Sequence, residues 1–188
     1  MIREHAEQLQ EVLSKIIEME PVVDALSAAI LTAFKSGKKL MTCGNGGSAS
    51  EAAHFAEEFT GRFFRERDSL PGMCLAADGA LITCIGNDYG YDEVFARQVA
   101  GLGQPGDVLA VFSSSGNSEN LLRALQVAKS KGIHTAAFLG KGGGRTAGVA
   151  DFELLVPSDS TMRSQEMHLF LLHMVCEKVE RAFLKLDD

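Results

Sequence analysis

The chain has 188 residues, of which 46% are hydrophobic and 23% charged, a composition typical of one soluble globular domain. This composition excludes disordered, collagen-like and low-complexity chains. The 25 acidic residues outnumber the 18 Lys and Arg residues, and the net charge of -7 argues against a general nucleic-acid-binding protein.

The N-terminal segment is amphipathic and acidic, without the apolar core of a signal peptide. No window approaches the roughly 18 continuous apolar residues of a membrane span. Four cysteines lie in apolar segments and form no C-x-x-C pair, so we interpret them as reduced, mostly buried thiols. We therefore expect a soluble, cytoplasmic protein with neither a membrane nor a nucleic acid as a partner.

Residues 1–36 predict two helices. Apolar residues recur at helical spacing from Leu9 to Ile17, and Pro21 opens a second amphipathic stretch that Gly37 ends. Short apolar runs and helical patterns then alternate. The runs are 39–43, 73–76, 108–112, 135–139 and 152–156; the helical patterns are about 48–63, 78–86, 91–101, 118–131 and 163–186, with a short turn near 145–149.

Largely apolar runs of this length are typical of strands that are buried on both faces of a parallel sheet. Their alternation with helices predicts an α/β fold, a doubly wound sandwich of about five parallel strands. Two N-terminal helices and a long C-terminal helix complete it. No repeat or linker divides the chain, so we expect one domain over residues 1–188, with residues 1–36 packed on it.

Two loops follow predicted strands and open predicted helices, which is where open α/β sheets bind ligands. The first contains Asn45, Gly46, Gly47 and Ser48, and its glycines allow close approach of an anion to free helix amides. The pattern also fits the dinucleotide motif G-x-G-x-x-A, or a tight turn without a ligand. The second loop offers the hydroxyls of Ser113, Ser114, Ser115 and Ser118.

The hydroxyl-rich loop has two interpretations. Asn117 or Ser118 would be enough to cap the following helix, whereas this stretch carries several hydroxyls. A phosphorylated small molecule therefore fits the two loops better than a dinucleotide does.

Two helices carry candidate acid-base and metal-ligating side chains. His54 and Glu58 are four positions apart, so they share a helix face at a spacing that suits a divalent metal. A surface ion pair is the alternative. On the last helix, His173 lies within an apolar run, where a lone histidine is more often a hydrogen-bonded core residue than a catalyst.

Taken together, the motifs resemble the SIS (sugar isomerase) domain family, and within it the phosphoheptose isomerases. They match in order and spacing along nearly the whole chain. The matching stretches are Cys43–Ser48, His54–Glu58 with Thr60-Gly-Arg62, Gly86-Asn-Asp88, Ser113–Ser118, and Gln165–His168 with His173.

The resemblance implies an aldose–ketose isomerase that converts sedoheptulose 7-phosphate to glycero-manno-heptose 7-phosphate. This would be the first step in the synthesis of a nucleotide-activated heptose, which is used for lipopolysaccharide or another heptose-containing glycan. It implies one zinc ion per subunit and a homotetramer. It assigns zinc ligation to His54, Glu58, Gln165 and His173, catalysis to Glu58 and His173, and substrate contacts to Asn45, Gly46, Gly47, Ser48, Glu58, Asn87, Asp88, Ser113, Ser114, Ser115, Ser118 and Gln165.

Three alternatives stand beside this interpretation. A non-catalytic SIS-domain protein, such as one that associates with a replication initiator, would share the loops but lack the residues at Glu58 and His173. An isomerase or sensor of another sugar phosphate would share the phosphate loops. A nicotinamide-dependent enzyme would need an acidic residue after the second strand, about 20 positions beyond the glycine loop, and Glu66, Asp68 and Asp78 do not meet both conditions.

One departure from the family pattern concerns the segment before Gln165. Met162 stands where some members carry an acidic residue, and Asp159 lies close by in the sequence. The departure bears on a supporting role and not on the predicted pair Glu58 and His173.

Overall fold

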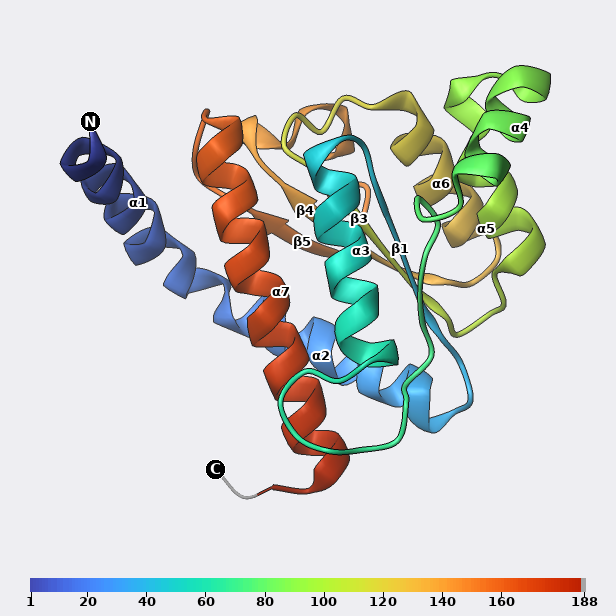
Figure 1. Ribbon diagram of the computed structural model, residues 1–188, viewed down its shortest axis with the longest axis horizontal. Helices are drawn as coiled ribbons and strands as arrows, with labels where there is room; N and C mark the ends of the chain where they lie inside the picture. Colours follow the sequence, from blue (N-terminus) through green and yellow to red (C-terminus); the bar gives the residue numbers. More distant parts are fainter. Residues whose placement is uncertain (187–188) are drawn as a thin grey trace.

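The computed structural model describes residues 1–186 and shows a five-stranded sheet between two helical layers (Figure 1). All four strand pairings are parallel, in the order β2-β1-β3-β4-β5. The strands are β1 (Leu40–Gly44), β2 (Gly72–Cys74), β3 (Val108–Ser113), β4 (His134–Leu139) and β5 (Phe152–Leu155). The α/β fold class predicted from the sequence is confirmed.

The helices divide between the two faces of the sheet (Figure 1). Helices α2, α3 and α7 pack on one face, with α1 against α7, and α4, α5 and α6 pack on the other face. Their bounds are α1 (Ile2–Ile16), α2 (Glu20–Lys35), α3 (Gly47–Thr60), α4 (Gly79–Tyr89), α5 (Ala96–Leu102), α6 (Glu119–Ser130) and α7 (Thr161–Leu184). Three short 3-10 helices are η1 (Ile17–Met19), η2 (Tyr91–Glu93) and η3 (Lys141–Thr146).

The central strands are largely apolar because successive side chains enter opposite cores. Val108, Ala110 and Phe112 of β3 face the α2, α3 and α7 side, whereas Leu109 and Val111 face α5 and α6. The edge strand β2 is only partly buried. Burial on two faces therefore explains why the inner strands show no polar alternation in the sequence.

The predicted elements differ from the structure mainly at their ends. The helix predicted at 48–63 ends at Thr60, and the one predicted at 91–101 is divided into η2 and α5. The thiols of Cys43 and Cys176 are buried as expected, but Cys84 is exposed. Among the described residues, no helix is both long and apolar enough to cross a bilayer.

A buried carboxylate fixes the start of β3 beside β1. The side chain of Asp107 is fully buried, accepts hydrogen bonds from the backbone amides of Lys39 and Gln104, and pairs with the Lys39 ammonium. These bonds replace the water that the carboxylate loses on burial, so removal of its charge leaves donors unpaired.

We expect Asp107→Asn to lower the free energy of unfolding by about 2–4 kcal/mol, because the amide nitrogen faces donors that a carboxylate oxygen satisfied. Urea denaturation of the wild type and the variant measures this difference. An unchanged unfolding midpoint would show that the buried pair contributes nothing net.

Candidate active site

The two candidate loops follow β1 and β3, which lie side by side. The strand order places this pair at the switch point of the sheet, where the chain runs outward in opposite directions and where open α/β sheets bind ligands. Gly44 at the end of β1 is in register with Phe112 near the end of β3. The glycine loop and the serine loop, separated by about seventy residues of sequence, are therefore neighbours in space.

The glycine loop makes a tight entry into α3. Gly46 has φ +57, a left-handed conformation that favours glycine. Gly47 leaves no room for a side chain, because a Cβ atom there would lie 2.5 Å from Nε2 of Gln165. The predicted site residue Gln165, on α7, is thus packed directly against the glycine loop.

Asn45 in this loop is held by two side chains that sequence reasoning missed. Its amide and that of Asn120 on α6 exchange two hydrogen bonds of 3.0 Å, and the hydroxyl of Tyr91 donates to Asn45 Oδ1 at 2.8 Å. Asn120 is almost fully buried. A buried amide within the apolar face of α6 was the available signal, but the sequence does not reveal its partner.

The serine loop folds partly upon itself. Ser113 Oγ accepts a hydrogen bond from the Gly116 amide, and Ser115 Oγ accepts one from the Asn117 amide. Ser118 is the N-cap residue of α6, yet within the described chain its side chain makes no capping hydrogen bond. Its hydroxyl is therefore not used by the helix cap, which was the alternative role for this residue.

The predicted acid-base residues come together between α3 and α7. His54 Nε2 lies 2.9 Å from Glu58 Oε1 and 3.4 Å from His173 Nε2, and that last nitrogen is 3.9 Å from the same carboxylate oxygen. One donor atom from each of the three residues falls within 4.8 Å of the others. His173 stands in an apolar run of the sequence, but its side chain is partly exposed to solvent and belongs to this cluster.

The donor set fits a divalent metal. Two imidazole nitrogens at about 2.0–2.1 Å from a tetrahedral zinc ion lie about 3.3 Å apart, close to the 3.4 Å observed between the two histidines. Burial, followed by the charge of His54, lowers the pKa of His173, and Glu58 opposes this shift. A neutral imidazole is the form that ligates metals.

Two predicted substrate contacts lie elsewhere. Asn87 and Asp88 are exposed on α4, on the other face of the sheet from the His–Glu–His cluster, and Asn87 donates a hydrogen bond to Asp88. Met162, which replaces the acidic residue of some relatives, is exposed in the first turn of α7. The described chain thus places the two loops side by side and packs Gln165 on the first of them. It brings His54, Glu58 and His173 together farther along α3 and α7, and it leaves Asn87 and Asp88 apart.

Comparisons with known proteins agree with one another over most of the chain. The SIS domain family model matches residues 4–140. The phosphoheptose isomerase of Campylobacter concisus is 43% identical over 183 residues, which cover 97% of each chain. The chain belongs to the phosphoheptose isomerase family. A relative of the same name from Nitratiruptor sp. is 50% identical over 157 residues, covering 84% of each chain.

A solved structure in this family has the same arrangement of elements. The phosphoheptose isomerase from Francisella tularensis superposes with a TM-score of 0.92 at 34% identity, over 96% of each chain. Membership of the phosphoheptose isomerase family therefore rests on sequence and on fold, both over nearly the full length.

We expect His54→Ala to weaken zinc binding by about tenfold or more, because it removes one of the three clustered donors. Loss of a residue that only hydrogen-bonds to a metal ligand already lowers metal affinity by about 10- to 100-fold. Titration with Zn²⁺ in competition with a chromophoric chelator measures the affinity. Equal affinities for the wild type and the variant would contradict a metal site at this cluster.

Proposed function

We propose that this protein is an aldose–ketose isomerase that converts D-sedoheptulose 7-phosphate to D-glycero-D-manno-heptose 7-phosphate, a step in heptose biosynthesis. The observation that carries the proposal is the cluster of His54, Glu58 and His173, which lies between α7 and the helix that the glycine loop opens. Its chemistry agrees with the activity named for the family members that match this chain.

The two loops would hold the substrate. Glycine-loop amides at the start of α3 suit an anion, and the hydroxyls of the serine loop can donate to phosphate and sugar oxygens. Gln165, packed on Gly47, would contact substrate at the glycine loop. The proposed substrate contacts are Asn45, Gly46, Gly47, Ser48, Glu58, Ser113, Ser114, Ser115, Ser118 and Gln165, with Asn87 and Asp88 contributing from α4.

The reaction moves one proton between adjacent carbons of the sugar. Glu58 would remove the proton from C1 of the ketose while His173 supplies a proton to the carbonyl oxygen on C2, which gives an enediol. Return of the proton to C2, with loss of the proton on the C1 oxygen, completes the aldose. The carbon skeleton undergoes no net oxidation, so the step needs no nicotinamide.

We propose zinc as the resident metal, one ion per subunit, held by His54, Glu58 and His173 with Gln165 as a fourth ligand. Bound there, the ion supplies positive charge where the substrate oxygens become negative. Glutamine is a neutral and weak ligand for zinc, so a site of moderate affinity is expected.

The alternatives have less support. A non-catalytic SIS-domain protein has no use for two histidines and a carboxylate whose donor atoms meet within 4.8 Å. An isomerase of another sugar phosphate would share the loops, but the relatives that match this chain over nearly its full length are named for heptose phosphate.

A solvent-exchange assay tests the proposed reaction. Zinc-loaded protein, mixed with sedoheptulose 7-phosphate in deuterated water, is expected to form an aldose with deuterium on the carbon next to the aldehyde. Proton NMR follows both signals. An aldose without deuterium would favour hydride shift, and no aldose from folded, zinc-loaded protein would contradict the function.

In the same assay, Glu58→Gln is expected to lower turnover by about 10²- to 10⁴-fold, because an amide of nearly equal shape does not accept the carbon proton. Substrate should still raise the melting temperature of this variant through the phosphate loops. Turnover at the wild-type rate would contradict the assignment of Glu58 as the base.

We propose that residues 1–188 form a single SIS domain that assembles as a cytoplasmic homotetramer. The N-terminal helices share one hydrophobic core with α3 and α7, which supports a single domain. An apolar hollow between α1 and α7, lined by Leu13, Ile17, Phe170 and Met174, supports a partner subunit, because exposed apolar patches mark interfaces.

Analytical ultracentrifugation is expected to show a species of about four times the 20.2 kDa of one chain. The variant Ile17→Lys places a charge in the hollow and should shift the distribution toward smaller species. A wild-type protein that sediments as a single chain would contradict the assembly.

A further inference from the structure

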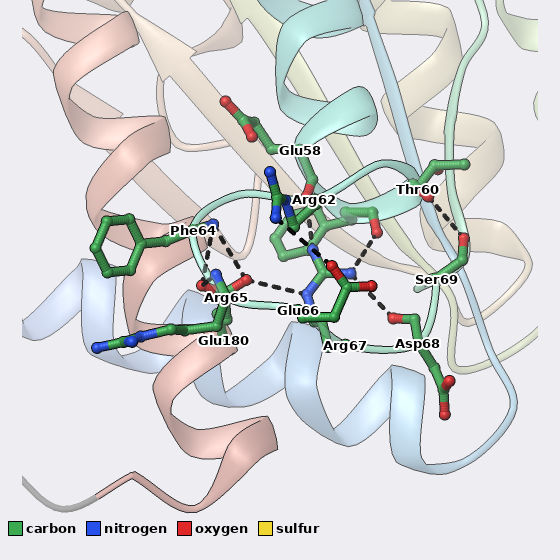
Figure 2. Close-up of polar contacts among 11 residues, drawn as sticks. Glu58, Thr60, Arg62, Phe64, Arg65, Glu66, Arg67, Asp68, Ser69 and Glu180 are labelled. Atoms are coloured by element: carbon green, nitrogen blue, oxygen red, sulfur yellow. Dashed lines mark hydrogen bonds and ion pairs between the residues drawn. The ribbon is translucent and has the colours of Figure 1, made fainter.

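A buried ion pair lies next to the end of α3, and neither of its two side chains is among the proposed substrate contacts. Figure 2 shows Arg67 and Glu180 pointing toward one another, from the segment after α3 and from α7. Their side chains are 0% and 5% exposed, and Arg67 Nε lies 3.2 Å from Glu180 Oε1. An ion pair without water is costly unless other hydrogen bonds satisfy both groups.

Both groups have such partners. Glu180 also accepts hydrogen bonds from the backbone amides of Phe64 and Arg65, at 3.2 and 3.0 Å. The Arg67 guanidinium donates from Nη1 to the carbonyls of Phe59 and Asp68, and from Nη2 to the carbonyl of Glu58 at 2.6 Å. The pair therefore joins α7 to the last turn of α3 through a rigid, planar fork.

The whole C-terminal end of α3 depends on this segment. The last four carbonyls of a helix have no partner within it. Here the Gly61 amide donates to the Glu57 carbonyl, and the Arg67 guanidinium donates to the carbonyls of Glu58 and Phe59. The Ser69 hydroxyl donates to the Thr60 carbonyl. A guanidinium at this position also complements the negative end of the helix dipole.

The same two helices carry the candidate metal ligands. Arg67 binds the backbone carbonyl of Glu58, whose side chain lies in the His–Glu–His cluster. Glu180 follows His173 by seven positions, which is two helical turns and hence the same face of α7. Cys176 lies between them; its burial, followed by the charge of Glu58, raises the pKa of the thiol, which stays protonated.

We infer that Arg67 and Glu180 are positioning residues that hold the last turn of α3 against α7, so that Glu58 and His54 meet His173 at metal-ligating distance. The inference rests on the proposed function of the cluster. Neither residue touches the cluster's donor atoms through its own side chain; each acts through the backbone of α3 and the placement of α7.

Two variants test this role in the full-length protein. Arg67→Lys keeps the positive charge but replaces the fork by a single ammonium, and Glu180→Gln keeps the shape but places an amide against donors. We expect Zn²⁺ affinity, measured by competition with a chromophoric chelator, to fall about 10- to 100-fold in both. We also expect kcat to fall more than KM rises, since the phosphate loops are unchanged.

Asp107→Asn is the matched control, because Asp107 is also a buried carboxylate that accepts from two backbone amides and one cation, the partly exposed Lys39, at the start of β3. It should lose stability but keep the wild-type Zn²⁺ affinity. Should Glu180→Gln fail to fold, Arg67→Lys decides alone.

The inference would be overturned if Arg67→Lys and Glu180→Gln lowered the unfolding midpoint, as Asp107→Asn does, but left Zn²⁺ affinity and kcat unchanged. The proposed function would then still stand. Failure of the wild type to bind Zn²⁺ would overturn both.

Discussion

The packing of α3 against the sheet and against α7, its neighbour on the same face, is the constraint on which the site depends. Phe55 and Phe59 of α3 lie in one core with Phe112 and Phe138 of the sheet and Val175 of α7. Their rings meet edge to face or stack, a geometry that fixes orientation as well as distance. Because this core sets how α3 faces α7, it also sets where the side chains at the helix interface can meet.

Much of the fold could be predicted from the sequence, because local patterns and the global arrangement agree. Apolar runs of four to six residues mark strands such as β3 and β4, whose neighbours cover both faces. Gly37 and Gly46 mark element ends because their positive φ favours glycine, and Pro21 marks a helix start because its fixed φ suits the first turn, where no amide hydrogen is needed. The helix predicted to run to residue 63 ends at Thr60, before the C-cap residue Gly61, and the carbonyls of its last turn find tertiary partners in Arg67 and Ser69 that the sequence does not reveal.

The candidate site was predictable only in part. His54 and Glu58 share a helix face by spacing alone, but their meeting with His173, more than a hundred positions later, follows from helix packing and was expected only from the family resemblance. Asn120 stands in an apolar helix face and Glu180 on the last helix, but the sequence does not reveal the hydrogen-bond partner of either side chain. Asn87 and Asp88 lie apart from the cluster on α4, so their proposed role in substrate binding is carried by the resemblance and not by the fold of one chain.

The central claim is that helix packing, and not a local motif, builds a metal site from His54, Glu58 and His173. X-ray absorption spectroscopy of the zinc-loaded protein tests it most directly, because zinc–sulfur distances of about 2.3 Å differ from zinc–nitrogen and zinc–oxygen distances of about 2.0–2.2 Å. The account predicts a first shell of nitrogen and oxygen atoms only, with imidazole scattering that weakens in His173→Ala. A shell containing sulfur, or one that His173→Ala leaves unchanged, would contradict it.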